Sequence, residues 1–230
     1  VSGATYTSKA ILAAVDSALN PGAAVEATPA PEAVDAAQAY LGLGVVNSGR
    51  IGPGKDDKET QVYSFNEVYA SAIFDGDGKI LYLYVDQLEV ATPNYDGESM
   101  PHLSGLPGQP GYNLDADHDE KVDGVTENTE DSFLAEIAAW KTKRERGESY
   151  KLNTATWQSE MDAFQKLFVG MTVDEVEAWF AKYTSDVNGR PLKADSTNEQ
   201  DVTKYGALSD ADKAYLADVT SSATMSLKDG

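Results

Sequence analysis

Cysteine is absent from the 230-residue sequence. This absence excludes disulfides, thiolate metal sites, iron–sulfur ligation and cysteine-based catalysis. Apolar runs long enough to cross a bilayer are also missing, so we expect no membrane insertion by this segment. Histidine is scarce, and the two that occur, His102 and His118, are too isolated to indicate a catalytic pair or a metal site.

Basic residues are few relative to acidic ones. The sequence has 18 Lys and Arg against 38 Asp and Glu, which gives a formal net charge of −20 and a pI near 4.3. Such a charge repels nucleic-acid phosphates, so we expect no nucleic-acid partner, and it suits an extracellular or cell-surface bacterial protein. The 41% hydrophobic and 9% aromatic content is that of a folded globular chain.

The segment 43–90 has the pattern of β-strands. Three runs within it, 61–65, 68–74 and 79–88, are dense in Tyr, Val, Ile and Leu. Asp75-Gly76-Asp77-Gly78 separates the last two runs and predicts a hairpin turn, because such turns need positive φ angles. Both faces of the last strand are apolar, so we expect helices or a ligand to cover it.

Helical periodicity dominates the rest of the chain, apart from a loop-like region over 93–129. The three tryptophans, Trp140, Trp157 and Trp179, recur at helical spacing and are expected in the core. Together the two patterns predict an α+β fold, a twisted antiparallel sheet with packed helices. The expected helices are a short one ending at Gly42 and four more at 131–146, 157–170, 172–183 and 209–218.

Two copies of one short motif stand near the two ends of the sequence. Aligning Thr5 with Thr224 also places Ser2 on Ser221, Ala4 on Ala223 and Lys9 on Lys228. A helix is expected over 8–19 after the first copy. An ordinary Ser/Thr helix cap is the alternative interpretation of each copy.

Both copies resemble the flavin-attachment motif of FMN-binding domains, Asp-x-x-Ser-Gly-Ala-Thr-x-Thr/Ser. In that family a flavin transferase joins FMN to the threonine through a phosphodiester bond. The resemblance implies covalent FMN on Thr224 and on Thr5. Asp218, Ser221, Ser222 and Ala223 complete the second copy, and Ser2, Gly3 and Ala4 complete the first.

The resemblance extends to the order of elements before the second motif. In the family a hairpin with an Asp-Gly-x-Ile turn leads to a strand that ends in Glu-Thr-Pro-Gly, which here corresponds to the segment at Thr92 and Pro93. Three residues depart from the pattern: Ala91 replaces the glutamate, Asn94 a glycine and Ser222 the motif glycine. The spacer over 93–217 is also longer than usual, as in enlarged domains from surface proteins of anaerobic Firmicutes.

The function that the resemblance implies is extracytoplasmic electron transfer by covalently bound FMN. We expect an electron carrier or reductase component rather than a self-sufficient enzyme, with a flavin transferase and redox proteins as partners. The alternative is a surface binding or structural module that keeps this scaffold without flavin. Residues 1–19 are expected to end a preceding flavin-type unit, 20–32 to form an Ala/Pro-rich linker and 33–230 to form the enlarged domain, as one piece of a longer chain. Packing of 8–19 on another copy would give head-to-tail self-association.

Two charged clusters have competing interpretations. Asp115, Asp117 and Asp119 alternate as calcium ligands do, although Glu120 and Thr126 break the EF-hand pattern, and a solvated acidic loop is the alternative. The basic run of Lys141, Lys143, Arg144 and Arg146 is interpreted as a solvated helix C-terminus, with docking to an acidic redox partner as the alternative.

Overall fold

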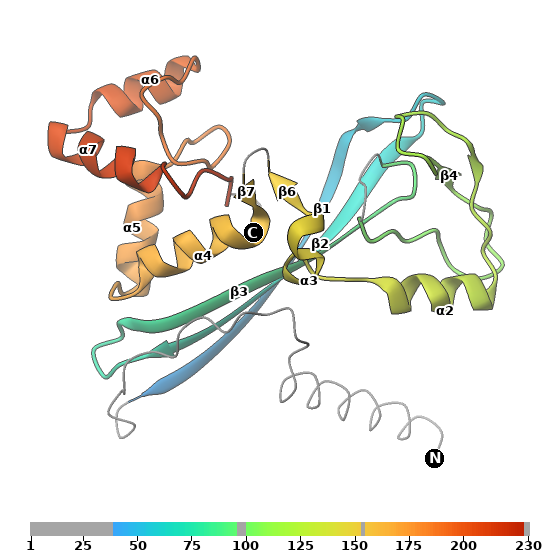
Figure 1. Cartoon of the computed structure of the whole chain (residues 1–230), viewed down its shortest axis with the longest axis horizontal. Coiled ribbons are helices and arrows are strands. Elements are labelled where there is room, and N and C mark those ends of the chain that lie inside the picture. Colours follow the sequence, from blue (N-terminus) through green and yellow to red (C-terminus); the bar gives the residue numbers. More distant parts are fainter. Residues whose placement is uncertain (1–38, 96–99, 153–154, 228–230) are drawn as a thin grey trace. The chain divides into compact units, whose positions relative to one another are not determined.

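A computed structural model describes residues 39–95, 100–152 and 155–227. Its main sheet is antiparallel and has three long strands in the order β1-β2-β3, which form a twisted ribbon (Figure 1). The strands are β1 (Tyr40–Lys55), β2 (Gln61–Phe74) and β3 (Ile80–Ala91). Helices follow the sheet in the chain, so the predicted α+β class is confirmed.

The hairpin between β2 and β3 turns where the sequence predicts. The Asp75 carboxylate accepts hydrogen bonds from the backbone N–H groups of Asp77 (2.9 Å) and Lys79 (2.8 Å). Gly78 completes the turn with a φ of 77°, a conformation that glycine adopts without strain. The two runs that were expected on either side of Asn66 and Glu67 form one continuous strand.

The first strand corrects a prediction. Tyr40 and Leu41 were expected in a helix ending at Gly42, but they begin β1, in which Leu41 pairs with Ile73 and Gly49 with Phe65. The local sequence does not predict this strand, because the glycines between 42 and 54 weaken the β pattern. Pairing with β2 supplies the hydrogen bonds that the local sequence does not predict.

Capping boxes fix the start of most helices. At Thr172 the side chain accepts from the Glu175 backbone, and the Glu175 side chain accepts in return from the Thr172 backbone, as the sequence predicts. The single helix expected over 131–146 is instead two helices, because the backbone becomes extended at Trp140 and Thr142 starts a new cap. The helices are α2 (Glu130–Ala139), α3 (Lys143–Arg146), α4 (Trp157–Phe168), α5 (Val173–Tyr183), α6 (Glu199–Gly206) and α7 (Asp210–Val219).

Short strand pairs connect some of these elements. β4 (Asn113–Leu114) pairs with β5 (Gly124–Val125), and β6 (Lys151–Leu152) pairs with β7 (Ala155–Thr156). A 3-10 turn over Gly147–Ser149 follows α3. In the part of the chain that the structure describes, no helix combines the length and the apolar character needed to cross a membrane.

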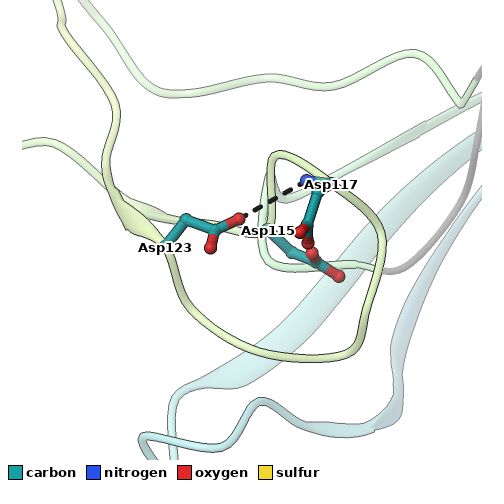
Figure 2. Close-up of side chains that lie close together, drawn as sticks. All are labelled: Asp115, Asp117 and Asp123. Carbon is teal, nitrogen blue, oxygen red and sulfur yellow. Dashed lines mark hydrogen bonds between the residues drawn. The ribbon is translucent and has the colours of Figure 1, made fainter.

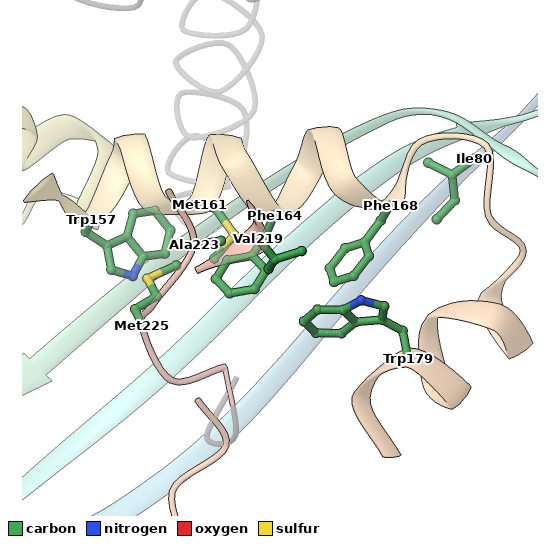
Figure 3. Packing of buried hydrophobic residues seen from close by; sticks show 9 residues of the cluster. All are labelled: Ile80, Trp157, Met161, Phe164, Phe168, Trp179, Val219, Ala223 and Met225. Carbon is green, nitrogen blue, oxygen red and sulfur yellow. The ribbon is translucent and has the colours of Figure 1, made fainter. Parts of the chain in front are cut away.

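The hydrophobic core lies where α4 packs on β3 and α5 (Figure 3). Phe164 is 1% exposed, and the Phe168 and Trp179 rings meet edge to face with centroids 5.4 Å apart. Two residues from the segment after α7, Ala223 and Met225, join the same cluster. Trp157 and Trp179 are core residues as predicted, whereas Trp140 is only half-buried.

Candidate functional site

The second motif forms a tight turn at the end of α7. Ser221 donates hydrogen bonds from its backbone N–H (3.1 Å) and its hydroxyl (2.6 Å) to the Asp218 carbonyl. The Ala223 N–H donates to the Val219 carbonyl at 2.9 Å, and the Ala223 methyl group is buried in the core. The turn therefore anchors Ala223 and presents the next residue, Thr224, at the edge of the core.

Thr224 binds a buried carboxylate on α4. Its hydroxyl donates to Glu160 Oε1 at 2.7 Å, and its backbone N–H donates to Glu160 Oε2. The Met225 N–H also donates to Oε2, at 2.9 Å. Glu160 is 5% exposed, and no lysine or arginine of the described residues forms an ion pair with it. Three hydrogen bonds from one short segment therefore compensate its charge.

A cavity of about 890 Å³ opens beside this pair. Alternating residues of β2 and β3 place one face of the sheet on one side of the cavity, and α4 with the segment after α7 forms the other side. The apolar part of the lining includes Val68, Leu83, Val85, Trp157, Met161, Phe164 and Met225, and Thr224 lines the cavity with them. The volume is within the usual range for sites that bind cofactors and small molecules.

Charged side chains also line the cavity, and most of them are basic. Lys143 forms a 2.9 Å ion pair with Glu89, to which Arg50 also approaches within 3.8 Å. Lys151 and Arg190 line the cavity too, and within the described ranges neither side chain has an ion-pair partner. The cavity thus carries excess positive charge in a chain whose net charge is −20.

The basic run on α3 is buried rather than solvated, which corrects the sequence interpretation. Lys143, Arg144 and Arg146 are each 7% exposed, and only Lys141 faces solvent. Arg144 Nε donates to the Val85 carbonyl at 2.7 Å, and its Nη2 donates to Gln165 Oε1 at 2.7 Å. Gln165 Oε1 also accepts from the Val85 N–H at 2.7 Å. Because β3 is an edge strand, Arg144 and Gln165 thus pair the two backbone groups of Val85 that a neighbouring strand would otherwise pair.

Burial shifts the ionisation of groups around α3. Desolvation raises the pKa of Asp86, although that carboxylate accepts hydrogen bonds from the backbone N–H groups of Gln87 and Arg144. Desolvation also lowers the pKa of Arg146, whose guanidinium lies 4.1 Å from the Tyr150 ring centroid. Neither Asp86 nor Arg146 lines the cavity, but Arg146 contacts Tyr150, which does.

The other residues that the resemblance implies lie elsewhere. The Thr92 hydroxyl accepts from the Tyr63 N–H at 3.1 Å, and Pro93 is fully buried, but neither residue lines the cavity next to Thr224. Ala91 and Asn94 are buried beside them, and Asn94 donates to Asp56 and to the Thr60 carbonyl. Thr5, Ser2, Gly3 and Ala4 lie outside the described residues, as do the expected helix over 8–19 and the linker over 20–32.

The acidic loop brings together a set of carboxylates that differs from the expected one (Figure 2). Asp115, Asp117 and Asp123 have ligand oxygens within 4.8 Å of one another, whereas Asp119 forms an ion pair with Lys121. Asp115 accepts from two backbone N–H groups, and Asp123 Oδ2 accepts from the N–H groups of Ala116 and Asp117. The triad could hold a hard cation such as calcium, but backbone amides already compensate much of its charge.

Comparison with known proteins adds one distant similarity. The chain is 29% identical over 202 residues to a protein named chlorophenol reductase from Desulfitobacterium hafniense. The alignment covers 83% of this chain and 53% of that protein, so the chain spans about half the length of the relative. No family model matches the chain, and no solved structure matches it significantly.

Sequence reasoning missed Glu160, although a signal was present. Glu160 follows Trp157 by one helical turn and precedes Phe164 by another, so it belongs to the apolar stripe of α4. A carboxylate in such a stripe needs a buried partner. Its partner, Thr224, is 64 residues away, which is why local pattern alone could not identify it.

Proposed function

We propose that this chain is an electron-transfer domain that carries FMN covalently on Thr224. One observation carries the proposal: the threonine of the attachment motif lies at the wall of the cavity described above. A flavin joined to its hydroxyl can enter that cavity without crossing the core. The isoalloxazine would supply the redox chemistry, and the chain would position it and exclude water.

The cavity lining suits the two chemically distinct parts of FMN. Apolar and aromatic residues, including Leu83, Val85 and Trp157, provide a surface for a planar ring system. Basic side chains of the lining attract a phosphate in an otherwise acidic protein. The distant similarity to a reductase supports a redox role for the domain.

The partners follow from this chemistry. Thr224 needs an external activating enzyme, because a threonine hydroxyl is a weak nucleophile without a base. We therefore infer a flavin transferase for maturation and redox proteins as electron donor and acceptor, on the outer surface of a bacterial cell.

Co-expression with a flavin transferase tests the proposal. We expect in-gel flavin fluorescence and a mass adduct on the peptide containing Thr224, and we expect Thr224→Val to abolish both. Ser222 is exposed, so Ser222→Gly restores the family glycine without disturbing the core and is expected to increase the modified fraction. Unmodified Thr224 beside a fully modified control domain would contradict the proposal.

A second function has one observation in its favour. The Thr224 hydroxyl is already bound to a buried carboxylate, which is a stable arrangement for a threonine that carries nothing. In that case the chain is a surface binding or structural module that keeps the scaffold without flavin. The same experiment separates the two functions, because such a module stays colourless whatever transferase is present.

A further inference from the structure

The contact between Thr224 and Glu160 cannot survive the attachment of a phosphate. In the attachment step the bond from Thr224 Oγ1 to phosphorus forms, the diphosphate bond of a flavin nucleotide donor breaks, and the rest of the donor leaves with its phosphate. Oγ1 releases its proton to solvent in this step and can no longer donate to Glu160 Oε1. The new phosphodiester also carries a negative charge beside a carboxylate that is 5% exposed.

Two like charges in a poorly solvated place repel each other strongly. The backbone N–H groups of Thr224 and Met225 can continue to bind Glu160, because esterification does not alter them. The Thr224 side chain is the part that has to move. Rotation about its Cα–Cβ bond separates Oγ1 from Glu160, in a residue that lines the cavity.

A basic side chain that has no ion pair among the described residues lines the same cavity. Arg190 lines the cavity with Thr224, and its guanidinium forms no ion pair with the described residues. The Ser226 hydroxyl donates to the Asn188 carbonyl, which joins the segment of Thr224 to the turn that carries Arg190. The Arg190 N–H in turn donates to Asn188 Oδ1 at 2.9 Å. Ser226, two residues after Thr224, is therefore hydrogen-bonded to Asn188, two residues before Arg190.

The other cations of the cavity are less suited to a phosphate. Lys143 and Arg50 both share Glu89, so their charges are partly compensated. Lys151 forms no ion pair with the residues that the structure describes, but it provides a single ammonium group, whereas a guanidinium matches two phosphate oxygens at once.

We propose that Arg190 is the phosphate-binding residue of the Thr224 site and that Glu160 is its competitor for Thr224. Glu160 binds the hydroxyl of the unmodified threonine. When Thr224 carries a phosphate, its side chain rotates away from Glu160 and the phosphate binds Arg190. The inference rests on the proposed attachment at Thr224 and identifies the residues that accept its phosphate. Both are positioning residues, because the role assigned to each is to hold Thr224 or its phosphate.

The test uses a full-length chain with phosphothreonine at position 224, which places the same charged group on the same oxygen without a flavin. Melting temperatures are measured for the phosphorylated and unmodified chains, each with the native sequence, Arg190→Gln or Glu160→Gln. Lys166→Gln is the matched control, because it removes one positive charge from an exposed site that does not line the cavity.

Arg190→Gln should lower the melting temperature of the phosphorylated chain by roughly 2–4 °C more than that of the unmodified chain. Glu160→Gln should lower the melting temperature of the unmodified chain, which loses hydrogen bonds, but raise that of the phosphorylated chain, which loses a repulsion. Lys166→Gln should shift both chains equally. Equal shifts for Arg190→Gln, or the same sign for Glu160→Gln in both chains, would overturn the inference.

Co-expression with a transferase separates this inference from the proposed function. If no variant gains flavin but the phosphothreonine effects appear, the phosphate site stands and the flavin proposal fails. If Thr224 gains flavin and the phosphothreonine effects are absent, attachment stands and the roles of Arg190 and Glu160 are wrong.

Discussion

Replacing Arg144 by alanine should destabilise the domain more than most single substitutions. The side chain bridges the edge of β3, α3 and α4: it donates to the Val85 carbonyl and to Gln165, and it lies 2.9 Å from Asp162. Its guanidinium also lies 4.7 Å from the Tyr84 ring centroid. Alanine would remove the donor that pairs the carbonyl of the half-buried Val85.

The magnitude follows from these contacts. Removing one partner from a buried, hydrogen-bonded charge network costs about 3–5 kcal/mol. Two hydrogen bonds to a charged donor, at about 1.5–3 kcal/mol each, give a similar total. For a domain of this size the loss corresponds to a fall in melting temperature of roughly 6–20 °C.

Urea unfolding followed by far-UV circular dichroism measures this loss. Lys141→Ala is the matched control, because Lys141 belongs to the same basic run but is exposed, and it should change stability by less than about 0.5 kcal/mol. Arg144→Lys should fall between the two, since it keeps the charge but loses the planar pair of donors. If Arg144→Ala lowers the free energy of unfolding by less than about 1 kcal/mol, the reasoning is refuted and Arg144 behaves as a solvent-exposed residue.

Two further predictions concern the core and the sheet. Phe164→Ala should destabilise the domain by about 3–5 kcal/mol in the same unfolding assay, because the side chain is 1% exposed at the centre of the α4 packing; a loss within 1 kcal/mol would contradict this packing. Burial and the hydrogen bond to Glu67 raise the pKa of Tyr69 from 10.0 to about 12. The folded state therefore holds this proton more tightly than the unfolded state does, and the stability that this difference contributes is lost as pH rises from 10 through 12. An ultraviolet titration of the native chain should show one tyrosine ionisation near pH 12, and this ionisation should be absent from Tyr69→Phe. Identical titration curves for the native chain and the variant would contradict the prediction.

The sequence predicts the elements whose signals are local. The β2–β3 turn depends on Asp75 and Gly78, which act within four residues of each other, and the start of α5 depends on the reciprocal cap of Thr172 and Glu175. The buried stripe of α4 follows from helical periodicity alone. These features need no knowledge of the rest of the chain.

The features that sequence reasoning missed depend on distant partners. β1 is glycine-rich and becomes a strand through its pairing with β2, and Arg144 is buried because the Val85 carbonyl, 59 residues away, needs a donor. The role of Glu160 likewise depends on a segment 64 residues later. For the candidate site, the motif identifies Thr224, but the cavity beside it and the residues that hold it emerge only from the folded chain.

The intact mass and peptide map of the protein purified from its native host test the central claim most directly. We predict a peptide in which Thr224 carries one FMN through a phosphodiester bond, together with flavin fluorescence that survives denaturation. A native protein whose Thr224 peptide has its unmodified mass, with no denaturation-resistant flavin fluorescence, would contradict it.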